Sequence, residues 1–370
     1  MYMKEKIAMI CQKFKQLRAW QKILVLTVIL TINSIVGLVL VSAFGKPTII
    51  SSVPPDTKEV VVPDEPRDIS NPLNGVLYKQ SEAKLWQNRL PLAVMVENLV
   101  DIRPQSGLSR ADIVYEALVE GGITRFMAVY LAEDINEIGP IRSSRPYYID
   151  WAEELGALYA HIGGSPAALD KLVDDNVKTL PEEWPYYKRK NSTLSSEHTA
   201  FSSTGSLWDM AQSKGYTGKT SIKSWRFKED ASSSARPASA QIKLDFSGQK
   251  DYKVQWEYEA ENNVYRRSAG SPAREHTDLV NNEQLNAKNV IVQFAKLSTL
   301  NDEKGRVEIQ TTDAGVARIF TDGKETDATW KKSSSTSRTT FYDTTGREIE
   351  FNRGKIWVEV VPDGSSVEYS

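Results

Sequence analysis

The sequence predicts an α/β (α+β) protein, with a layered α/β sandwich in its N-terminal part and a β-rich C-terminal part, preceded by one transmembrane helix. Three patterns carry this prediction. A long run without charges lies near the N-terminus, strand-like and helix-like runs alternate between residues 90 and 215, and polar and apolar residues alternate after residue 240. With 370 residues, 40% hydrophobic and 25% charged, the chain is neither largely disordered nor a multi-span membrane protein, and its length suggests two domains.

The first 45 residues predict a membrane anchor. Residues 1–22 carry six basic side chains and one acidic one, a formal charge of +5, and are interpreted as a cytoplasmic stub. Residues 23–45 contain no charged side chain and are long enough, at about 1.5 Å per residue, to cross a hydrocarbon core of about 30 Å. Because the basic cluster comes first, the positive-inside rule predicts a single-pass membrane protein with a cytoplasmic N-terminus and extracytoplasmic C-terminal domains. A cleaved signal peptide is the alternative, since Val41-Ser42-Ala43 resembles a cleavage site.

Residues 46–75 predict an extended tether between the anchor and the folded part. Six of the sixteen prolines fall in this segment, among Ser, Asp and Glu. Proline removes a backbone donor and fixes φ, so such a segment favours neither a regular helix nor a central strand.

The exported part is mildly acidic and has no thiol. The only cysteine, Cys11, precedes the span, which excludes a lipid-bearing cysteine after it, as well as disulfides and thiolate metal sites in the exported part. Outside the +5 stub, acidic residues outnumber basic ones by 47 to 40, a charge of -7. This balance argues against a nucleic-acid partner.

Residues 76–230 are interpreted as an α/β domain. Strands are expected at residues 91–96, 113–119, 123–131 and 158–162, and helices at 144–158, from 166 to about 173, and at 207–214. Glu120-Gly121-Gly122 predicts a hairpin connection between the strands at 113–119 and 123–131. With a two-residue turn, Leu118 pairs with Arg125, and Glu116 and Glu120 lie on the same face of the sheet as Arg125.

Residues 241–363 are interpreted as a mostly antiparallel β domain. Tyr252, Val254, Trp256 and Tyr258 alternate with polar residues, so one face of this strand is aromatic and the other is predicted to face solvent. Further strands are expected at residues 264–267, 289–297, 306–311, 316–321, 339–342, 348–351 and 355–361.

Two expected helix starts carry the candidate binding residues. Arg142, Ser143 and Arg145 precede one helix, and Gly163, Gly164 and Ser165 precede the next; helix N-termini with basic and small neighbours suit anionic groups. The set expected to bind a ligand is Asn98, Arg103, Arg125, Arg142, Ser143, Arg145, Gly163, Gly164 and Ser165. The alternative is structural: the arginines pair with internal acids such as Glu116 or Glu120, and the serines cap helices.

Whether the protein is an enzyme stays open. The candidate acid and base groups are Glu97, Glu116, His161 and His198. The three histidines show no metal-ligand spacing, and Gly-x-Ser-x-Gly is absent around Ser165, so we expect no metal site and no cofactor.

Several motifs in order resemble one known family. They are ENLVDIRPQSGLSRADIVYEALVEGGITRF (97–126), GPIRSSRPY (139–147), HIGGSP (161–166), YRRSAGSPAREHTD, NVIVQFA, GKETDATWKK and GKIWVEVVP. These are similar to the YerB-like family of bacterial proteins of unknown function, over about residues 76–363. The resemblance implies an extracytoplasmic, membrane-attached protein with an N-terminal α/β sandwich and a β-rich C-terminal domain. Its motif positions here are Glu97, Asn98, Arg103, Glu116, Arg125, Arg142, Arg145 and His161.

Three departures from the family pattern limit what carries over. Many members are lipoproteins, whereas this chain has a predicted span. Glu197-His198-Thr199 stands where a Pro-His-Asn-like segment is expected, so only His198 carries over. Glu275-His276-Thr277-Asp278 stands where Pro-His-x-Asp is usual.

Three hypotheses about function follow. The first is a membrane-anchored protein that binds an anionic or carbohydrate-like cell-envelope ligand in an arginine-rich cleft. The second is an envelope hydrolase or transferase that uses carboxylate and histidine chemistry. The third is a scaffold that binds another membrane protein through the sheet of the β domain.

Overall fold

The computed structural model describes residues 65–190 and 193–370, together with Arg18, Trp20, Gln21 and Thr27. The chain divides into two units, Met1–Pro63 and Asp64–Ser370, and the second contains all the elements described below. The predicted stub, the span at 23–45 apart from Thr27, and the tether up to residue 64 lie outside the described residues. Within the described ranges, no helix is long and apolar enough to span a bilayer.

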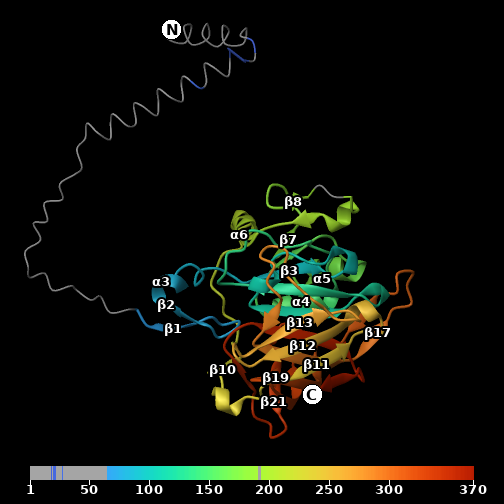
Figure 1. The fold of residues 1–370 in the computed structure, drawn as a ribbon. Coiled ribbons are helices and arrows are strands. Elements are labelled where there is room, and N and C mark those ends of the chain that lie inside the picture. The colour runs from blue at the N-terminus through green and yellow to red at the C-terminus, as the bar shows by residue number, and fades with distance from the viewer. Residues whose placement is uncertain (1–17, 19, 22–26, 28–64, 191–192) are drawn as a thin grey trace, which may run out of the picture. The chain divides into compact units, whose positions relative to one another are not determined.

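A mixed ten-stranded sheet forms the centre of the folded unit (Figure 1). It contains strands from both halves of the sequence, and strand β23 pairs in parallel with β16 on one side and with β4 on the other. The sheet therefore runs across the boundary between the predicted domains 76–230 and 241–363, whose division stays a prediction. In spatial order the strands are β21 (Thr340–Asp343), β20 (Lys324–Lys332), β19 (Asp313–Thr321), β16 (Asn289–Ala295), β23 (Ile356–Pro362), β4 (Ile113–Leu118), β5 (Thr124–Tyr130), β3 (Leu92–Glu97), β6 (Leu158–His161) and β7 (Thr179–Pro181).

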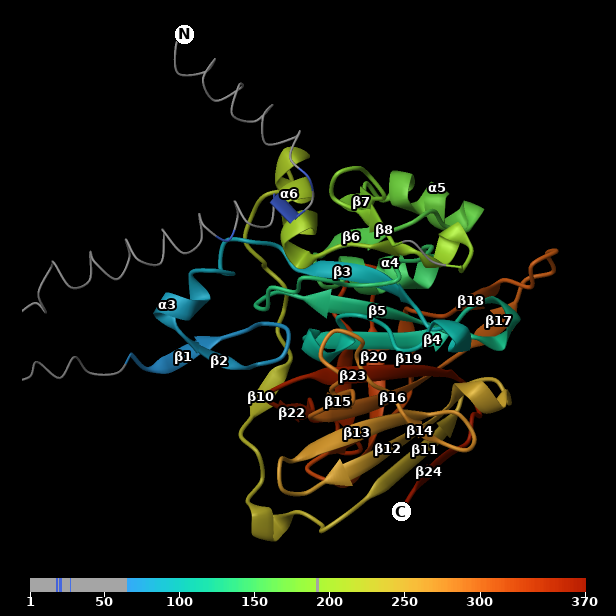
Figure 2. The same ribbon diagram turned by 45° about the horizontal axis from the view of Figure 1, so that its top comes forward.

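A second sheet packs against one face of the first (Figure 2). Val254, Trp256 and Tyr258 point inward from β12 and share a core with Val290 and Trp357 of the large sheet. This confirms the predicted alternation, because the intervening residues of β12 are exposed or half-buried. The second sheet contains β11 (Gln241–Asp245), β12 (Lys253–Glu259), β13 (Val264–Ala269), β14 (Arg274–Glu275), β15 (Asn286–Ala287) and β24 (Val367–Tyr369).

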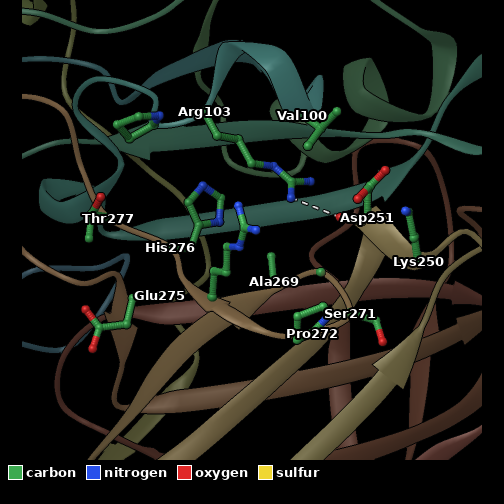
Figure 3. Close-up of a pocket in the computed structure, with 13 residues that line it drawn as sticks. Val100, Arg103, Lys250, Asp251, Ala269, Ser271, Pro272, Glu275, His276 and Thr277 are labelled. Atoms are coloured by element: carbon green, nitrogen blue, oxygen red, sulfur yellow. Dashed lines mark hydrogen bonds between the residues drawn. The ribbon is translucent and has the colours of Figure 1, made fainter.

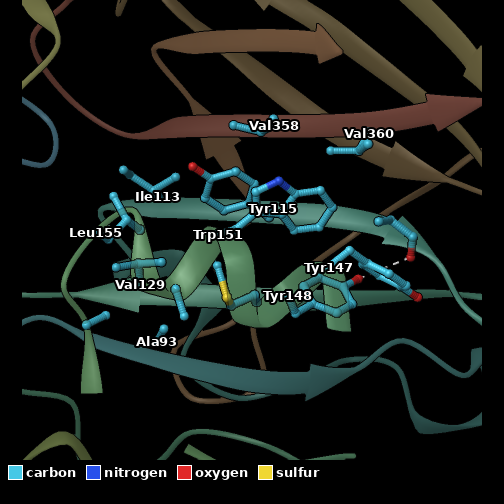
Figure 4. Packing of buried hydrophobic residues seen from close by; sticks show 14 of the residues in the cluster. Ala93, Ile113, Tyr115, Val129, Tyr147, Tyr148, Trp151, Leu155, Val358 and Val360 are labelled. Carbon is cyan, nitrogen blue, oxygen red and sulfur yellow. Dashed lines mark hydrogen bonds between the residues drawn. The ribbon is translucent and has the colours of Figure 1, made fainter. Parts of the chain in front are cut away.

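Helices pack on both faces of the large sheet. Helix α4 (Pro146–Glu153) buries Tyr147, Tyr148 and Trp151, and the Trp151 ring stacks on Tyr115 of β4 with centroids 5.3 Å apart (Figure 4). Helix α5 (Pro166–Asp174) contributes Ala168 and Leu172 to the same core, whereas α6 (Thr204–Ser213) packs on the opposite face. Both α4 and α5 start with proline, which suits the first turn of a helix because its missing N–H would have no intrahelical partner.

Shorter elements complete the unit. Strand β1 lies within the segment that the sequence assigns to the tether, and the side chains of Asn71 and Asn74 just after it are buried against Asp112, with N–O distances of 3.0 and 2.6 Å. Residues 67–75 are therefore part of the folded unit. The shorter elements are β1 (Arg67–Ser70), β2 (Leu77–Lys79), α3 (Gln80–Ala83), β8 (Lys188–Arg189), β9 (Ala200–Phe201), β10 (Arg226–Lys228), β17 (Leu297–Thr299), β18 (Val307–Ile309) and β22 (Glu350–Asn352).

The predicted hairpin exists, but its predicted register is wrong by one residue. The loop between β4 and β5 contains a 3₁₀ turn with Gly121 and Gly122 at positive φ, so Ala117 rather than Leu118 lies opposite Arg125. A shift of one residue moves a side chain to the other face of a sheet. Glu116 therefore lies on the face opposite to Arg125, not beside it.

Candidate functional site

The large sheet separates the candidate residues into two clusters. Glu97 and Asn98 are consecutive at the end of β3, so their side chains point to opposite faces. Glu97 belongs to a helix-side cluster with Arg125, Arg142, Ser143, Arg145, His161, Gly163, Gly164, Ser165 and His198. Asn98 belongs to a sheet-side cluster with Arg103, Glu116, Arg267, His276 and Glu359. The four predicted arginines therefore do not line one cleft, since Arg103 lies on the other face of the sheet.

Glu97 is the centre of the helix-side cluster. One carboxylate oxygen accepts a hydrogen bond from Nδ1 of His198 at 2.8 Å, and the other forms an ion pair with Nε of Arg142 at 3.1 Å. The Glu97 side chain is 4% exposed, while those of His198 and Arg142 are 14% and 17% exposed. The sequence predicted all three as site residues, and the fold brings them into direct contact.

Glu197 completes this group from a 3₁₀ turn (Ser196–His198). Its Oε2 lies 3.3 Å from Nη1 of Arg142, and its Oε1 lies 3.5 Å from Nε2 of His198. The guanidinium of Arg142 holds the pKa of Glu197 below its usual range. The Glu197 side chain covers the Nε2 of His198, but because it is 60% exposed, surrounding side chains do not pack tightly around it.

Arg125 and Arg145 also belong to the helix-side cluster. Arg145 donates to both carboxylate oxygens of Glu120, from Nε at 2.6 Å and from Nη2 at 2.5 Å, which confirms the predicted structural pairing. Arg125 donates to the carbonyl of Ser143 at 2.6 Å, and no carboxylate in the described part of the chain lies within 4.0 Å of its guanidinium. Burial, together with the charges of Arg145 and Arg142, lowers the pKa of Arg125 to about 10.

The two helix starts lie side by side, and their polar groups bond to each other. The N–H of Ser144 donates to the carbonyl of Gly163 at 3.1 Å, and the Ser165 hydroxyl caps α5 by accepting from Ala168 N at 3.2 Å. His161 donates from Nδ1 to the carbonyl of Gly163 at 2.8 Å, and its Nε2 lies 2.6 Å from the Thr179 hydroxyl. Burial lowers the pKa of His161, which favours this neutral, fully bonded form.

The sheet-side cluster is a buried ion-pair network. Glu116 pairs with Arg267 at 2.6 Å, with both side chains at most 1% exposed, and also accepts from Asn98 and Thr124. Glu359 lies opposite Glu116 in the register of β23 and β4. Burial and the neighbouring Glu116 charge raise the pKa of Glu359 well above its usual range, which favours its protonated form.

Arg267 and Glu359 were absent from the residues singled out in the sequence, although one signal for Glu359 was present. The strand Lys355–Val361 carries a lone carboxylate in an apolar run, and buried charges are rare unless paired. What the sequence did not contain was the pairing of this strand with β4, which puts two carboxylates together.

Two motif segments that are far apart in the sequence dock here. His276 donates from Nε2 to Oε1 of Gln105 at 2.7 Å, and its Nδ1 accepts from Arg267. Asp278 accepts from the backbone N–H groups of Gly107 and Ser109 at 3.1 and 2.8 Å. The segments 103–109 and 275–278 therefore join the two halves of the fold.

A pocket of about 400 Å³ opens beside this junction (Figure 3). We call it the Arg103 pocket. Arg103 lines it and donates to Asn98 Oδ1 and to the carbonyl of Asp251, both at 2.9 Å. Of the predicted arginines, the lining includes Arg103 only. The lining residues are Val100, Arg103, Pro104, Lys250, Asp251, Ala269, Gly270, Ser271, Pro272, Arg274, Glu275, His276 and Thr277.

Two of the residues that line the Arg103 pocket are unpaired cations. Lys250 and Arg274 are exposed, and neither side chain forms a hydrogen bond or ion pair with any residue in the described ranges. With Asp251 and Glu275 also in the lining and His276 neutral, the ionised side chains sum to +1. As to metals, the described residues contain no group of three or more His, Cys, Asp and Glu that could hold an ion.

Comparisons with known proteins agree on one relationship. Two family models match, "Protein of unknown function (DUF3048) N-terminal domain" at residues 75–217 and "Protein of unknown function (DUF3048) C-terminal domain" at residues 242–358. The curated protein named "Putative lipoprotein YerB" of Bacillus subtilis (strain 168) is 29% identical over 308 residues, which are 82% of this chain and 89% of that protein. The crystal structure of the YerB protein from Bacillus subtilis matches with a TM-score of 0.71 and 26% identity, covering 82% of this chain and 100% of that one.

Proposed function

The chain belongs to the two-domain DUF3048 family, and on this premise we propose that it is a membrane-attached extracytoplasmic protein that binds an anionic or carbohydrate-like envelope ligand in the Arg103 pocket. The observation that carries the binding part is the pair of exposed, unpaired cations, Lys250 and Arg274, which line the same pocket as Arg103. Charged groups without an internal partner are available for a phosphate or carboxylate, which an arginine fork binds well.

The attachment part rests on two observations. A relative that matches 82% of this chain is named a putative lipoprotein. This chain has no cysteine after residue 45 that could carry a lipid, but its uncharged run at residues 23–45 could serve as the anchor instead. The test uses Cys11, which is the only native thiol. In cells that express the full chain, a membrane-impermeant maleimide should label a Ser52→Cys variant but leave Cys11 unlabelled. A mature protein that begins after residue 45 would show instead that the run is a cleaved signal.

The binding test titrates the detergent-solubilised full chain with glucose 1-phosphate, glucuronate and neutral glucose by calorimetry. We expect the two anions to bind and the double variant Lys250→Ala/Arg274→Ala to weaken binding at least tenfold, because each lost charged contact contributes about 1 kcal/mol or more. The control is Lys219→Ala/Lys304→Ala, which removes two exposed lysines elsewhere. Equal binding by both double variants, or no binding of either anion, overturns the proposed pocket.

The geometry reduces the number of candidate acid and base groups for the enzymatic alternative. Glu116 is buried in an ion pair with Arg267, and both ring nitrogens of His161 are hydrogen-bonded, so neither side chain is available to a substrate. Of the predicted acid and base groups, the pair Glu97 and His198 keeps a partly exposed imidazole. The test of the scaffold alternative is a pull-down from membranes with the full chain as bait.

A further inference from the structure

His198 differs from the other two histidines of the chain in the state of its Nε2. In His161 this nitrogen is 2.6 Å from a threonine hydroxyl, and in His276 it is 2.7 Å from a glutamine oxygen, and both rings are buried. In His198 it faces the carboxylate of the exposed Glu197, 3.5 Å away. Displacement of one exposed side chain is therefore enough to free this nitrogen.

The inner side of His198 is fixed. Nδ1 donates to the buried carboxylate of Glu97, so in the neutral imidazole the proton sits on Nδ1 and the lone pair on Nε2 points outward. Arg142 pairs with the other oxygen of Glu97 at 3.1 Å, so both carboxylate oxygens are held in place. A carboxylate that orients an imidazole in this way is the arrangement a general base requires.

The position of the Glu197 carboxylate indicates which kind of ligand group can bind beside Arg142 and His198. One of its carboxylate oxygens lies against Arg142 and the other against His198, at 3.3 and 3.5 Å. An anionic oxygen of a ligand can take the same place, with a second oxygen-bearing group at His198. Because Glu197 is on a short turn and 60% exposed, it can leave this place without disturbing the core.

We propose that Glu97, His198 and Arg142 form a second functional centre, on the opposite face of the sheet from the Arg103 pocket, that hydrolyses carboxylic esters bearing a nearby anionic group. Glu197 occupies the place of that anion in the free protein. As water attacks the ester carbonyl, its proton passes to Nε2 of His198. The bond between the carbonyl carbon and the alcohol oxygen then breaks, and the imidazolium returns the proton to the leaving alcohol, which leaves a carboxylic acid and an alcohol. Arg142 binds the anion, and Glu97 is a positioning residue.

The experiment compares two chromogenic probes with the full-length protein, the 4-nitrophenyl monoester of succinate, which is an anion, and neutral 4-nitrophenyl acetate. We expect a higher kcat/KM for the succinate monoester and at least a tenfold loss in His198→Gln. Glu97→Gln should lower kcat with little change in KM, whereas Arg142→Gln should raise KM for the anionic ester alone. Far-UV circular dichroism of each variant separates these effects from unfolding.

The most discriminating variant in this test is Glu197→Gln. Glu197→Gln should raise kcat/KM for the anionic ester about threefold, because it removes the competing charge, and the matched exposed variant Glu229→Gln should leave it unchanged. A purely structural role for the four residues predicts no gain in any variant. The proposal is overturned by turnover that does not exceed the buffer rate, by a rate that His198→Gln leaves intact, or by a loss of activity in Glu197→Gln.

A second measurement needs no substrate. Diethyl pyrocarbonate acylates neutral imidazole nitrogens, so peptide mapping after brief treatment should find His198 modified before His161 and His276. Glu97→Gln should slow modification of His198 and leave the other two unchanged. Equal reactivity of the three histidines would contradict a free, oriented Nε2.

Discussion

Replacing Glu154 by glutamine should destabilise the protein more than any exposed ion-pair change. Glu154 follows α4 and is fully buried, and its carboxylate binds Lys332 at 2.6 Å, Arg338, and the Tyr115 hydroxyl at 2.9 Å. The side chains of Lys332 and Arg338 are 0% and 3% exposed, so Glu154→Gln leaves two buried cations without a counter-charge. Removing one partner of a buried pair costs about 3 to 5 kcal/mol, which for a folded unit of about 300 residues corresponds to a fall in Tm of about 5 to 8 °C.

The loss should depend on pH in a defined direction. Burial raises the pKa of Glu154, but the charges of Arg338 and Lys332 outweigh burial and hold the pKa below its usual value. The carboxylate therefore stabilises the fold fully above the unfolded-state pKa of about 4.3, and this contribution disappears as the pH falls through the lower folded-state pKa. The difference in Tm between the wild type and Glu154→Gln should accordingly be full at pH 7 and shrink below about pH 4.

Thermal unfolding followed by near-UV circular dichroism measures the effect. The control is Glu229→Gln, which breaks the exposed pair with Arg353 and should change the free energy of unfolding by less than about 1 kcal/mol. Adding Lys332→Met to Glu154→Gln removes one uncompensated cation and should recover part of the loss. A loss below about 1 kcal/mol in Glu154→Gln, or no recovery in the double variant, would refute the reasoning that uncompensated buried charge sets the cost.

Two further predictions concern the sheet-side cluster. Glu116→Gln should lower the free energy of unfolding by about 3 kcal/mol, because it leaves the buried Arg267 without its counter-charge. Glu359→Gln should cost less than about 1 kcal/mol, because the raised pKa of Glu359 favours the protonated form, which glutamine resembles. Urea unfolding of both variants tests this, and equal losses would contradict it. Burial and the charge of Arg267 hold the pKa of His276 well below its usual range, so the unfolded chain takes up a proton that the folded chain does not, and stability should fall as the pH drops below about 6.5. Tm measured from pH 7.5 to pH 5 should decline less in His276→Gln, and parallel declines would argue against this assignment.

Much of the local structure followed from short-range patterns. Proline after Arg145 and after Ser165 marked the starts of α4 and α5, and the period of two in residues 252–258 identified the buried face of β12. Such signals depend on backbone sterics and on the burial of one face, both of which act over a few residues. The strand at Lys324–Lys332 was missed, because its polar and charged residues outnumber its apolar ones.

The candidate site was less predictable, because its geometry depends on registers and pairings. The one-residue change in the hairpin moved Glu116 away from Arg125, and the parallel pairing of β23 with β4 placed Glu359 beside Glu116. The contact of Glu97 with His198 spans 101 positions in the sequence. No local pattern sets a contact at that separation.

By itself, then, the sequence determined the mostly stranded α+β character of the folded part and its family, because strand and helix periodicity and ordered motifs are properties of short segments. The tertiary structure decided which charged groups face each other. It joined strands from both halves into one sheet, put Arg103 on one face and Arg142 on the other, left Lys250 and Arg274 unpaired, and set the exposed Glu197 against the Nε2 of His198. The physical reason is that a sheet sorts side chains between its faces by register, and register is fixed only when distant strands pair.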